Sequence, residues 1–191
     1  EISGTDVMPS YNLVTPGNHT VHLNTVTDKG CNDDIVLPLY VYPKPVPTIS
    51  VDDPNGCADH DVVLSAGVLA SSTDHNNSIV SWDWDVQSNG IIDFTTDNSG
   101  SIVDTISFTY GNSSAVQSQF YQVTVTATTD DGCVGSFSST PTFIEVYANP
   151  VADFTYDTDP EPDVQNPLVQ FIDQSQGASN WAWEFNDPAS S

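Results

Sequence analysis

The chain has 191 residues, of which 26 are acidic and only two are basic, so its formal net charge at neutral pH is −24. Such a polyanion repels nucleic-acid backbones and anionic lipid head groups, and no run of about 18 apolar residues occurs that would cross a membrane. We therefore expect neither nucleic acid as a partner nor membrane insertion of this segment.

Residues 1–46 contain the first predicted strand. Val21 and Leu23 alternate with polar neighbours, and a period of two is typical of a strand with one apolar face. A Gly-Cys turn follows this strand, and the proline-rich stretch 43–47 marks a joint in the chain.

Residues 47–148 contain further strands of the same kind. Alternation recurs around Leu64 and again from Tyr121 to Ala127, and turn clusters rich in Asp, Asn, Gly and Ser separate these runs. No stretch carries the apolar stripe of an amphipathic helix. A second joint is marked by Asn149–Pro150, and the whole pattern predicts an all-β chain.

Three motifs occur twice, about 100 residues apart, which is the size of one immunoglobulin-like sandwich. The pairs are Thr-Asp-Lys-Gly-Cys at 27–31 with Thr-Asp-Asp-Gly-Cys at 129–133, Val-Tyr-Pro-Lys-Pro-Val at 41–46 with Val-Tyr-Ala-Asn-Pro-Val at 146–151, and Trp-Asp-Trp at 82–84 with Trp-Ala-Trp at 181–183. The sequence therefore predicts tandem modules.

The repeated motifs resemble those of PKD (polycystic-kidney-disease-type) modules. Trp-Glu-Phe-Asn-Asp-Pro at 183–188 resembles the family signature Trp-Asp-Phe-Gly-Asp-Gly, although Asn186 departs from its glycine loop. The later signature, Gly-x-Tyr-x-Val-x-Leu-x-Val-x-Asp-x-x-Gly-Cys, is resembled by 17–31, where His19 replaces the tyrosine, and by 121–133. The resemblance implies immunoglobulin-like β-sandwiches. It also implies core positions for Trp84, Trp183 and Tyr121.

The module boundaries do not coincide with the two ends of the sequence. Residues 1–46 correspond to the second half of a module, 47–148 to a complete module, and 149–191 to the first half of a module. Half a sandwich cannot bury its apolar face. Either the chain is one two-module repeat of a longer array, with its halves completed by neighbouring copies, or it is an arbitrary window on an array of non-identical modules.

The acidic loops are the candidate metal sites. Carboxylate and amide oxygens around a tight glycine turn suit Ca²⁺, which prefers oxygen ligands, but the same residues also suit turns and a solvated surface. The candidate ligands are Asp83, Asp85, Asn89 and Asp93 in one loop and Asp52 and Asp53 in another. The motifs of serine hydrolases, zinc proteases and phosphate-binding loops do not occur, so we do not expect an enzyme.

The cysteines and the Asn-x-Ser/Thr sequons are candidate modification sites. In a sandwich of this type, Cys57 lies at the end opposite to the hairpin turns that hold Cys31 and Cys133, so a bond within one module is not expected. In a head-to-tail array, Cys57 faces the counterpart of Cys31 in the following module, which predicts a bridge between modules or else free thiols. The sequons begin at Asn18, Asn76 and Asn112.

Together, these features favour a non-catalytic structural or adhesive repeat of an extracellular surface fibre or large adhesin. The expected partners are neighbouring copies or modules in a head-to-tail array, together with glycans, and Ca²⁺ is the candidate cofactor. The alternative is an accessory region of a secreted hydrolase that binds polysaccharide or collagen. An exposed row of aromatic side chains on one sheet would favour this alternative.

Overall fold

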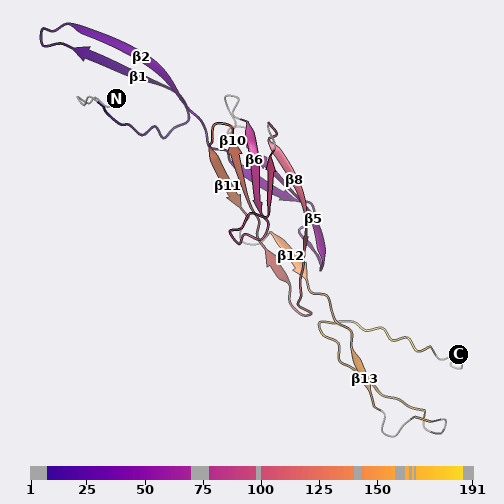
Figure 1. Cartoon of the computed structure of the whole chain (residues 1–191). Coiled ribbons are helices and arrows are strands. Elements are labelled where there is room, and N and C mark those ends of the chain that lie inside the picture. The colour runs from indigo at the N-terminus through magenta and orange to yellow at the C-terminus, as the bar shows by residue number, and fades with distance from the viewer. Residues whose placement is uncertain are drawn as a thin grey trace.

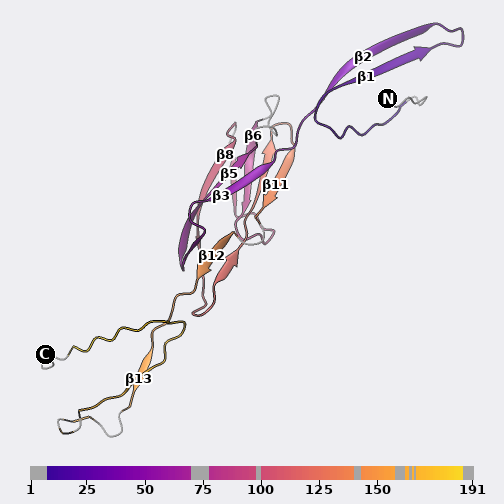
Figure 2. The same cartoon turned by 180° about the vertical axis from the view of Figure 1, so that it is seen from behind.

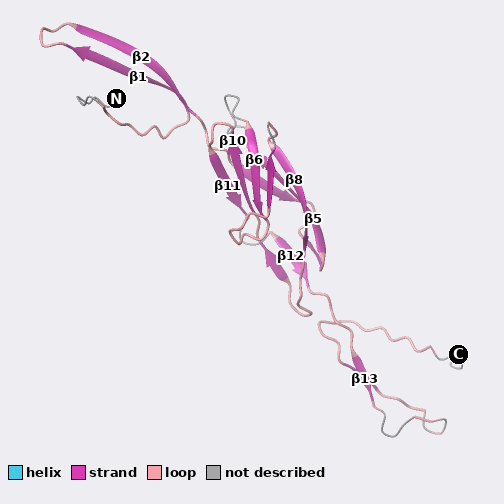
Figure 3. Cartoon of the chain, in the orientation of Figure 1, coloured by secondary structure: helices cyan, strands magenta, loops and turns pink. Residues whose placement is uncertain are grey.

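The computed structural model describes residues 8–69, 78–97, 100–139, 143–157, 162–163, 165 and 167–186. These residues form fourteen strands and no helix, so the predicted all-β fold class is confirmed (Figure 3). The molecule is elongated (Figure 1): an N-terminal hairpin projects from one end of a central unit, and a C-terminal segment extends from the other end.

The N-terminal hairpin consists of β1 (Gly17–Val26) and β2 (Asn32–Val41), which pair along their whole length. A tight turn joins them, in which the amide of Thr27 donates to the carbonyl of Cys31 over 2.8 Å. Gly30 adopts a φ of 85° in this turn, a conformation that side chains with a Cβ rarely accept. Among the described residues this sheet has two strands, and no second sheet of the described structure packs on its faces.

The central unit contains the ten strands from β3 to β12, in sheets of the sandwich type (Figure 2). One sheet has the order β3-β5-β8, a second has β11-β10-β6-β7, and a third, smaller one has β4-β12-β9. The strands are β3 (Pro47–Val51), β4 (Asn55–Cys57), β5 (His60–Val68), β6 (Ile79–Asp85), β7 (Phe94–Asp97), β8 (Val103–Tyr110), β9 (Gln119–Tyr121), β10 (Thr124–Thr129), β11 (Val134–Ser138) and β12 (Ile144–Tyr147).

The buried core of the described residues lies between these sheets. Alternate residues of β5, β6 and β10 point inward, as the period of two requires, and form one cluster. The indole of Trp84 is fully buried and donates a 2.8 Å hydrogen bond to the carboxylate of Asp104. The cluster contains Val62, Leu64, Ala66, Ile79, Trp82, Trp84, Val86, Tyr110, Val123, Val125, Ala127, Ile144 and Val146.

The C-terminal segment begins with β13 (Phe154–Tyr156) and β14 (Phe171–Asp173), which pair antiparallel. The chain then continues without regular secondary structure through 177–186, where aromatic side chains lie over Phe171. No described side chain of this segment is fully buried. The segment therefore has strands but no core of its own.

Both flanking strand pairs repeat the register of the central unit. Leu23 lies opposite Ile35 as Val125 lies opposite Phe137, and His19 lies opposite Leu39 as Tyr121 lies opposite Ile144. The pairing of β1 with β2 thus repeats the pairing of β9 with β12 and of β10 with β11.

The same holds for the C-terminal pair, in which Tyr156 lies opposite Phe171 as Val51 lies opposite Leu64. The amide of Asp157 donates to the carbonyl of Gln170, and the amide of Asp52 donates in the same way to the carbonyl of Val63. β13 and β14 are therefore the counterparts of β3 and β5.

Candidate functional site

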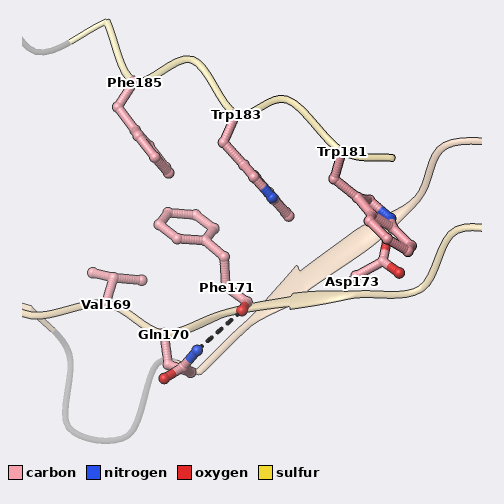
Figure 4. Close-up of a pocket in the computed structure, with 7 residues that line it drawn as sticks. All are labelled: Val169, Gln170, Phe171, Asp173, Trp181, Trp183 and Phe185. Atoms are coloured by element: carbon pink, nitrogen blue, oxygen red, sulfur yellow. Dashed lines mark hydrogen bonds between the residues drawn. The ribbon is translucent and has the colours of Figure 1, made fainter. Parts of the chain in front are cut away.

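An open aromatic groove dominates the C-terminal segment (Figure 4). Its volume is about 590 Å³, and its walls are formed by β14 on one side and the extended chain of 181–185 on the other. The ring of Phe171 lies 5.2 Å from that of Phe185 and 5.9 Å from that of Trp183, measured between centroids. We call this surface the aromatic groove, and its lining residues are Val169, Gln170, Phe171, Asp173, Trp181, Trp183 and Phe185.

The groove exposes residues whose counterparts in the central unit are buried. Trp183 is 43% exposed and Trp181 is 54% exposed, whereas Trp82 and Trp84 are fully buried. The aromatic surface extends to Phe154, whose ring centroid lies 5.3 Å from that of Trp183. Trp183, which the family resemblance places in a core, therefore lies on the surface of this chain.

An apolar face on the hairpin β1–β2 is the second unusual surface. Its members lie on the side of the strands that corresponds to the inward side of β10 and β12 in the central unit. Each is between 46% and 57% exposed, while the counterparts Val125 and Ile144 are buried. We call this surface the hairpin face, and its large aliphatic residues are Val21, Leu23, Ile35, Leu37 and Leu39.

The predicted metal loop after β6 uses its acidic groups within the loop. The carboxylate of Asp85 is nearly buried and accepts hydrogen bonds from the amides of Gln87, Asn89 and Gly90, at 3.3, 3.0 and 2.7 Å. These bonds close the turn, and they occupy both carboxylate oxygens. The loop is thus stabilised by Asp85 acting as an acceptor for backbone amides.

The other three candidates of this loop also have local partners. The carboxylate of Asp93 accepts from the amide of Val86 at 2.9 Å, and the side-chain carbonyl of Asn89 accepts from the amide of Ile91. Asp83 accepts a 2.6 Å hydrogen bond from the hydroxyl of Thr95.

The second acidic loop lies between β3 and β4. The carboxylate of Asp52 accepts from the amides of Val63 and Asp53, both at 2.8 Å, and these bonds hold the pKa of Asp52 below its ordinary value. Asp53 accepts from the amide of Asn55 at 3.3 Å. Across the described ranges, no group of three or more His, Cys, Asp or Glu side chains has the geometry of a metal site.

The three cysteines are free thiols in this chain. Cys57 on β4 lies opposite Tyr147, near the exit of the central unit toward the C-terminal segment. Cys133 follows the turn after β10, two residues before Gly135, which lies against Pro45 of the linker to the hairpin, and Cys31 occupies the same place in the turn of the hairpin. The cysteines of the two turns thus lie at one end of their units and Cys57 at the other.

The sequons differ in their surroundings. Asn18 is exposed on β1. The side-chain nitrogen of Asn112 donates to the carbonyls of Gln117 and Val146, at 2.8 and 2.9 Å, so both of its hydrogens are engaged in the folded chain. Asn76 lies outside the described residues.

No protein-family model and no curated protein matches this sequence. In the parts of the chain that the structure describes, no helix is long and apolar enough to span a bilayer.

Sequence reasoning singled out the two tryptophans but expected Trp183 in a core, and it identified neither the aromatic groove nor the hairpin face as a surface. One signal was present: aligning the Gly-Cys turns places Leu23 at the position of Val125, and aligning the tryptophan pairs places Phe185 at the position of Val86. This alignment could have identified both surfaces, because it places their apolar residues at core positions of a module.

Proposed function

We propose that this chain is a non-catalytic structural repeat of an extracellular surface fibre, built from tandem immunoglobulin-like modules of the PKD type. The observation that supports this function is the pair of exposed apolar surfaces at opposite ends of the molecule. Leu23 of the hairpin face and Trp183 of the aromatic groove correspond to Val125 and Trp84, which are buried in the core of the central unit. Contiguous exposed apolar patches are rare on monomeric proteins and mark interaction surfaces.

The elongated shape agrees with a spacer function. The proline-rich linker lies between the hairpin and the central unit, and Pro43, Pro45 and Pro47 are buried. Buried prolines restrict the linker because their φ is fixed and their rings are packed. A chain with such joints transmits orientation from one module to the next.

Electron microscopy of the native material tests the fibre function. We expect continuous filaments whose repeating unit contains two modules. Discrete particles without a repeating unit would contradict it.

The alternative is substrate binding beside a catalytic domain, and the exposed aromatic groove is the observation that favours it. Aromatic rings on a surface can stack on sugars, but here the counterparts of Trp181 and Trp183 belong to a core. A pull-down with insoluble polysaccharides and with collagen separates the two functions. The alternative requires retention of the chain and its loss in Trp183→Ala.

Two further features belong to the same proposal. Ca²⁺ would bind the acidic loops and stiffen the joints of the array.

Cys57 would bond to Cys31 of the following module, because the hairpin turn of that module adjoins the joint at which Cys57 lies. Forming this bond transfers two electrons from the thiols to an external oxidant such as dioxygen and releases two protons.

A further inference from the structure

In the central unit, β10 has a strand on each side. Val125 lies opposite Phe137 of β11 and, on its other side, opposite Trp84 of β6. Within the described residues, β1 has β2 on the side that corresponds to β11, and no strand on the side that corresponds to β6. The hairpin therefore presents an open edge together with its apolar face.

The chain of 181–185 also lacks a paired strand among the described residues. It corresponds to β6 through the tryptophan pair, yet in the described structure no strand is paired with it. In Figure 4 the side chains of Trp183 and Phe185 project from this extended chain toward Phe171 on β14. These side chains lack the layer that β10 and β12 provide in the central unit.

The two surfaces cannot meet within one molecule. The hairpin face and the aromatic groove lie at opposite ends of the elongated chain, with the whole central unit between them (Figures 1 and 2). The hairpin face and the aromatic groove of one copy therefore do not cover each other. A second copy of this chain carries the missing part in the required register.

We propose that the hairpin β1–β2 of one copy docks onto the aromatic groove of a second copy and completes its sandwich. β1 pairs antiparallel with the chain of 181–185, so that Leu23 lies opposite Trp183 and Asn24 lies opposite Ala182. This register follows from that of the central unit, where Val125 lies opposite Trp84 and Thr126 opposite Asp83. Docking buries the large aliphatic residues of the hairpin face against the rings of the groove.

This docking rests on the proposed fibre function, because it names the partner of each end. The two proposals are contradicted by different results. Discrete particles in the native material would contradict the fibre function, whereas the docking is contradicted if the purified chain does not associate.

The test measures the mass of the purified chain by sedimentation velocity over a range of concentrations. We expect wild-type oligomers that grow with concentration. Leu23→Asp and Trp183→Asp each lower the association constant by about a hundredfold or more, because a charge is then desolvated without a partner. Asn24→Asp and Glu184→Gln are the matched controls, and they associate like the wild type.

A mixture of the two disruptive variants provides a second measurement. The Leu23→Asp copy keeps its groove and the Trp183→Asp copy keeps its hairpin, so the mixture gives dimers and nothing larger, while each variant alone is a monomer. Thermal unfolding of the central unit, unchanged in all variants, shows that they are folded. A mixture that stays monomeric, or single variants that associate like the wild type, would overturn the proposal.

The register has its own test in a background in which Cys31, Cys57 and Cys133 are replaced by serine. The pair Asn24→Cys and Ala182→Cys forms a disulfide between copies when oxidised glutathione is added, because directly opposed residues lie within bonding reach. The diagonal pair His22→Cys and Ala182→Cys forms it at least about tenfold more slowly, since diagonal neighbours are about 7–8 Å apart. Equal rates, or a faster diagonal pair, would overturn the register.

Discussion

At the scale of single residues, the acidic side chains shape the loops of the central unit. Asp85 ends β6 and accepts hydrogen bonds from three amides of the loop that follows. Its side chain is only 5% exposed in spite of its charge. A buried carboxylate is tolerated when amide donors replace water, so this residue is a structural part of the loop.

Replacing Asp85 by alanine leaves these amides without their acceptor. We expect Asp85→Ala to lower the free energy of unfolding by about 2–3 kcal/mol, because three hydrogen bonds to a nearly buried, charged acceptor are lost at once. Chemical denaturation followed by tryptophan fluorescence measures this change. The matched control, Asp83→Ala, removes one hydrogen bond at a half-buried position and should cost less than about 1 kcal/mol. Equal effects of the two variants would contradict this role of Asp85.

Asp52 gives the chain a pH dependence of defined sign. Its pKa is lowered from 3.8 by the amides of Val63 and Asp53, so its ionised form is favoured by folding. The stabilisation is present above pH 3.8 and is lost as the pH falls through the lowered pKa.

The variant Asp52→Ala should therefore be less stable than the wild type at neutral pH, and the difference in melting temperature should shrink below about pH 4. Thermal unfolding from pH 7 to pH 2 measures both quantities. A difference that is independent of pH would exclude the carboxylate as its source.

At the scale of elements, β1 and β2 pair with each other along their whole length, but the large aliphatic residues on one face of the hairpin stay about half exposed. Two-stranded hairpins are marginally stable in water unless a face is covered. Lys29 lies in the turn of this hairpin, and its side chain is 84% exposed. Lys44 is the only other basic residue, and Pro45 follows it directly.

Trypsin, which cleaves after Lys and Arg but poorly before proline, should therefore cut the free chain once, after Lys29. Exposed turn tips are favoured sites of proteolysis. Mass spectrometry should find fragments 1–29 and 30–191, and Lys29→Gln should resist cleavage. Oligomers should be cut more slowly than monomers, because the docked turn adjoins another module. Early cleavage after Lys44 would contradict this picture of the hairpin and its linker.

The strands were predictable from the sequence because their period of two is a local property. The alternation around Leu64 and from Tyr121 onward predicted strands that the structure contains as β5, β9 and β10. The roles of the acidic residues were not predictable, because an aspartate that accepts amides within its loop has the same local sequence as one that binds a cation. Only the structure shows that Asp85 accepts hydrogen bonds from amides of its own loop.

The exposure of Trp183 shows the corresponding limit at the scale of packing. The sequence motif identifies a residue that belongs in a core, whereas the burial of that residue depends on covering strands that the described part of this segment does not contain. A repeat alignment can therefore predict where a side chain points, but its burial requires knowledge of every layer around it.

At the scale of the whole molecule, charge is the dominant feature. A net charge of −24 on 191 residues favours solubility and opposes close approach of copies. Salt reduces this repulsion, since the screening length falls from about 30 Å at 0.01 M to about 10 Å at 0.1 M. Association of apolar surfaces on such a polyanion should depend strongly on the ionic strength.

We expect the oligomer mass of the chain to rise as NaCl is raised from about 0.01 to 0.1 M. CaCl₂ at matched ionic strength separates screening from binding: a specific Ca²⁺ site raises the mass and the melting temperature further, and EDTA reverses both effects. Equal effects of the two salts would remove Ca²⁺ from the proposed function.

A second feature of the whole molecule is the contact at its N-terminal joint. A Cβ placed on Gly135 of β11 would collide with the carbonyl oxygen of Pro45 in the linker. The absence of a side chain thus permits the linker to pack directly on the central unit.

Gly135→Ala should force these two backbones apart. We expect a loss of about 1–3 kcal/mol in the free energy of unfolding, as is usual for overpacking, together with a wider spread of hairpin orientations in small-angle X-ray scattering. Gly67→Ala is the control, since a Cβ at Gly67 would meet nothing closer than 3.6 Å. If both variants behave alike, the joint does not depend on this contact.

The packed joint also has a geometric consequence. A linker with buried prolines and a direct backbone contact fixes one rotation and one translation between the hairpin and the central unit. When copies are added head to tail, the same operation is applied at every step, and a rotation that does not close into a ring generates a helix. The pitch and handedness of the filament would therefore depend on the residues between Val41 and Pro47, together with the second joint at Asn149–Pro150 and the register of docking.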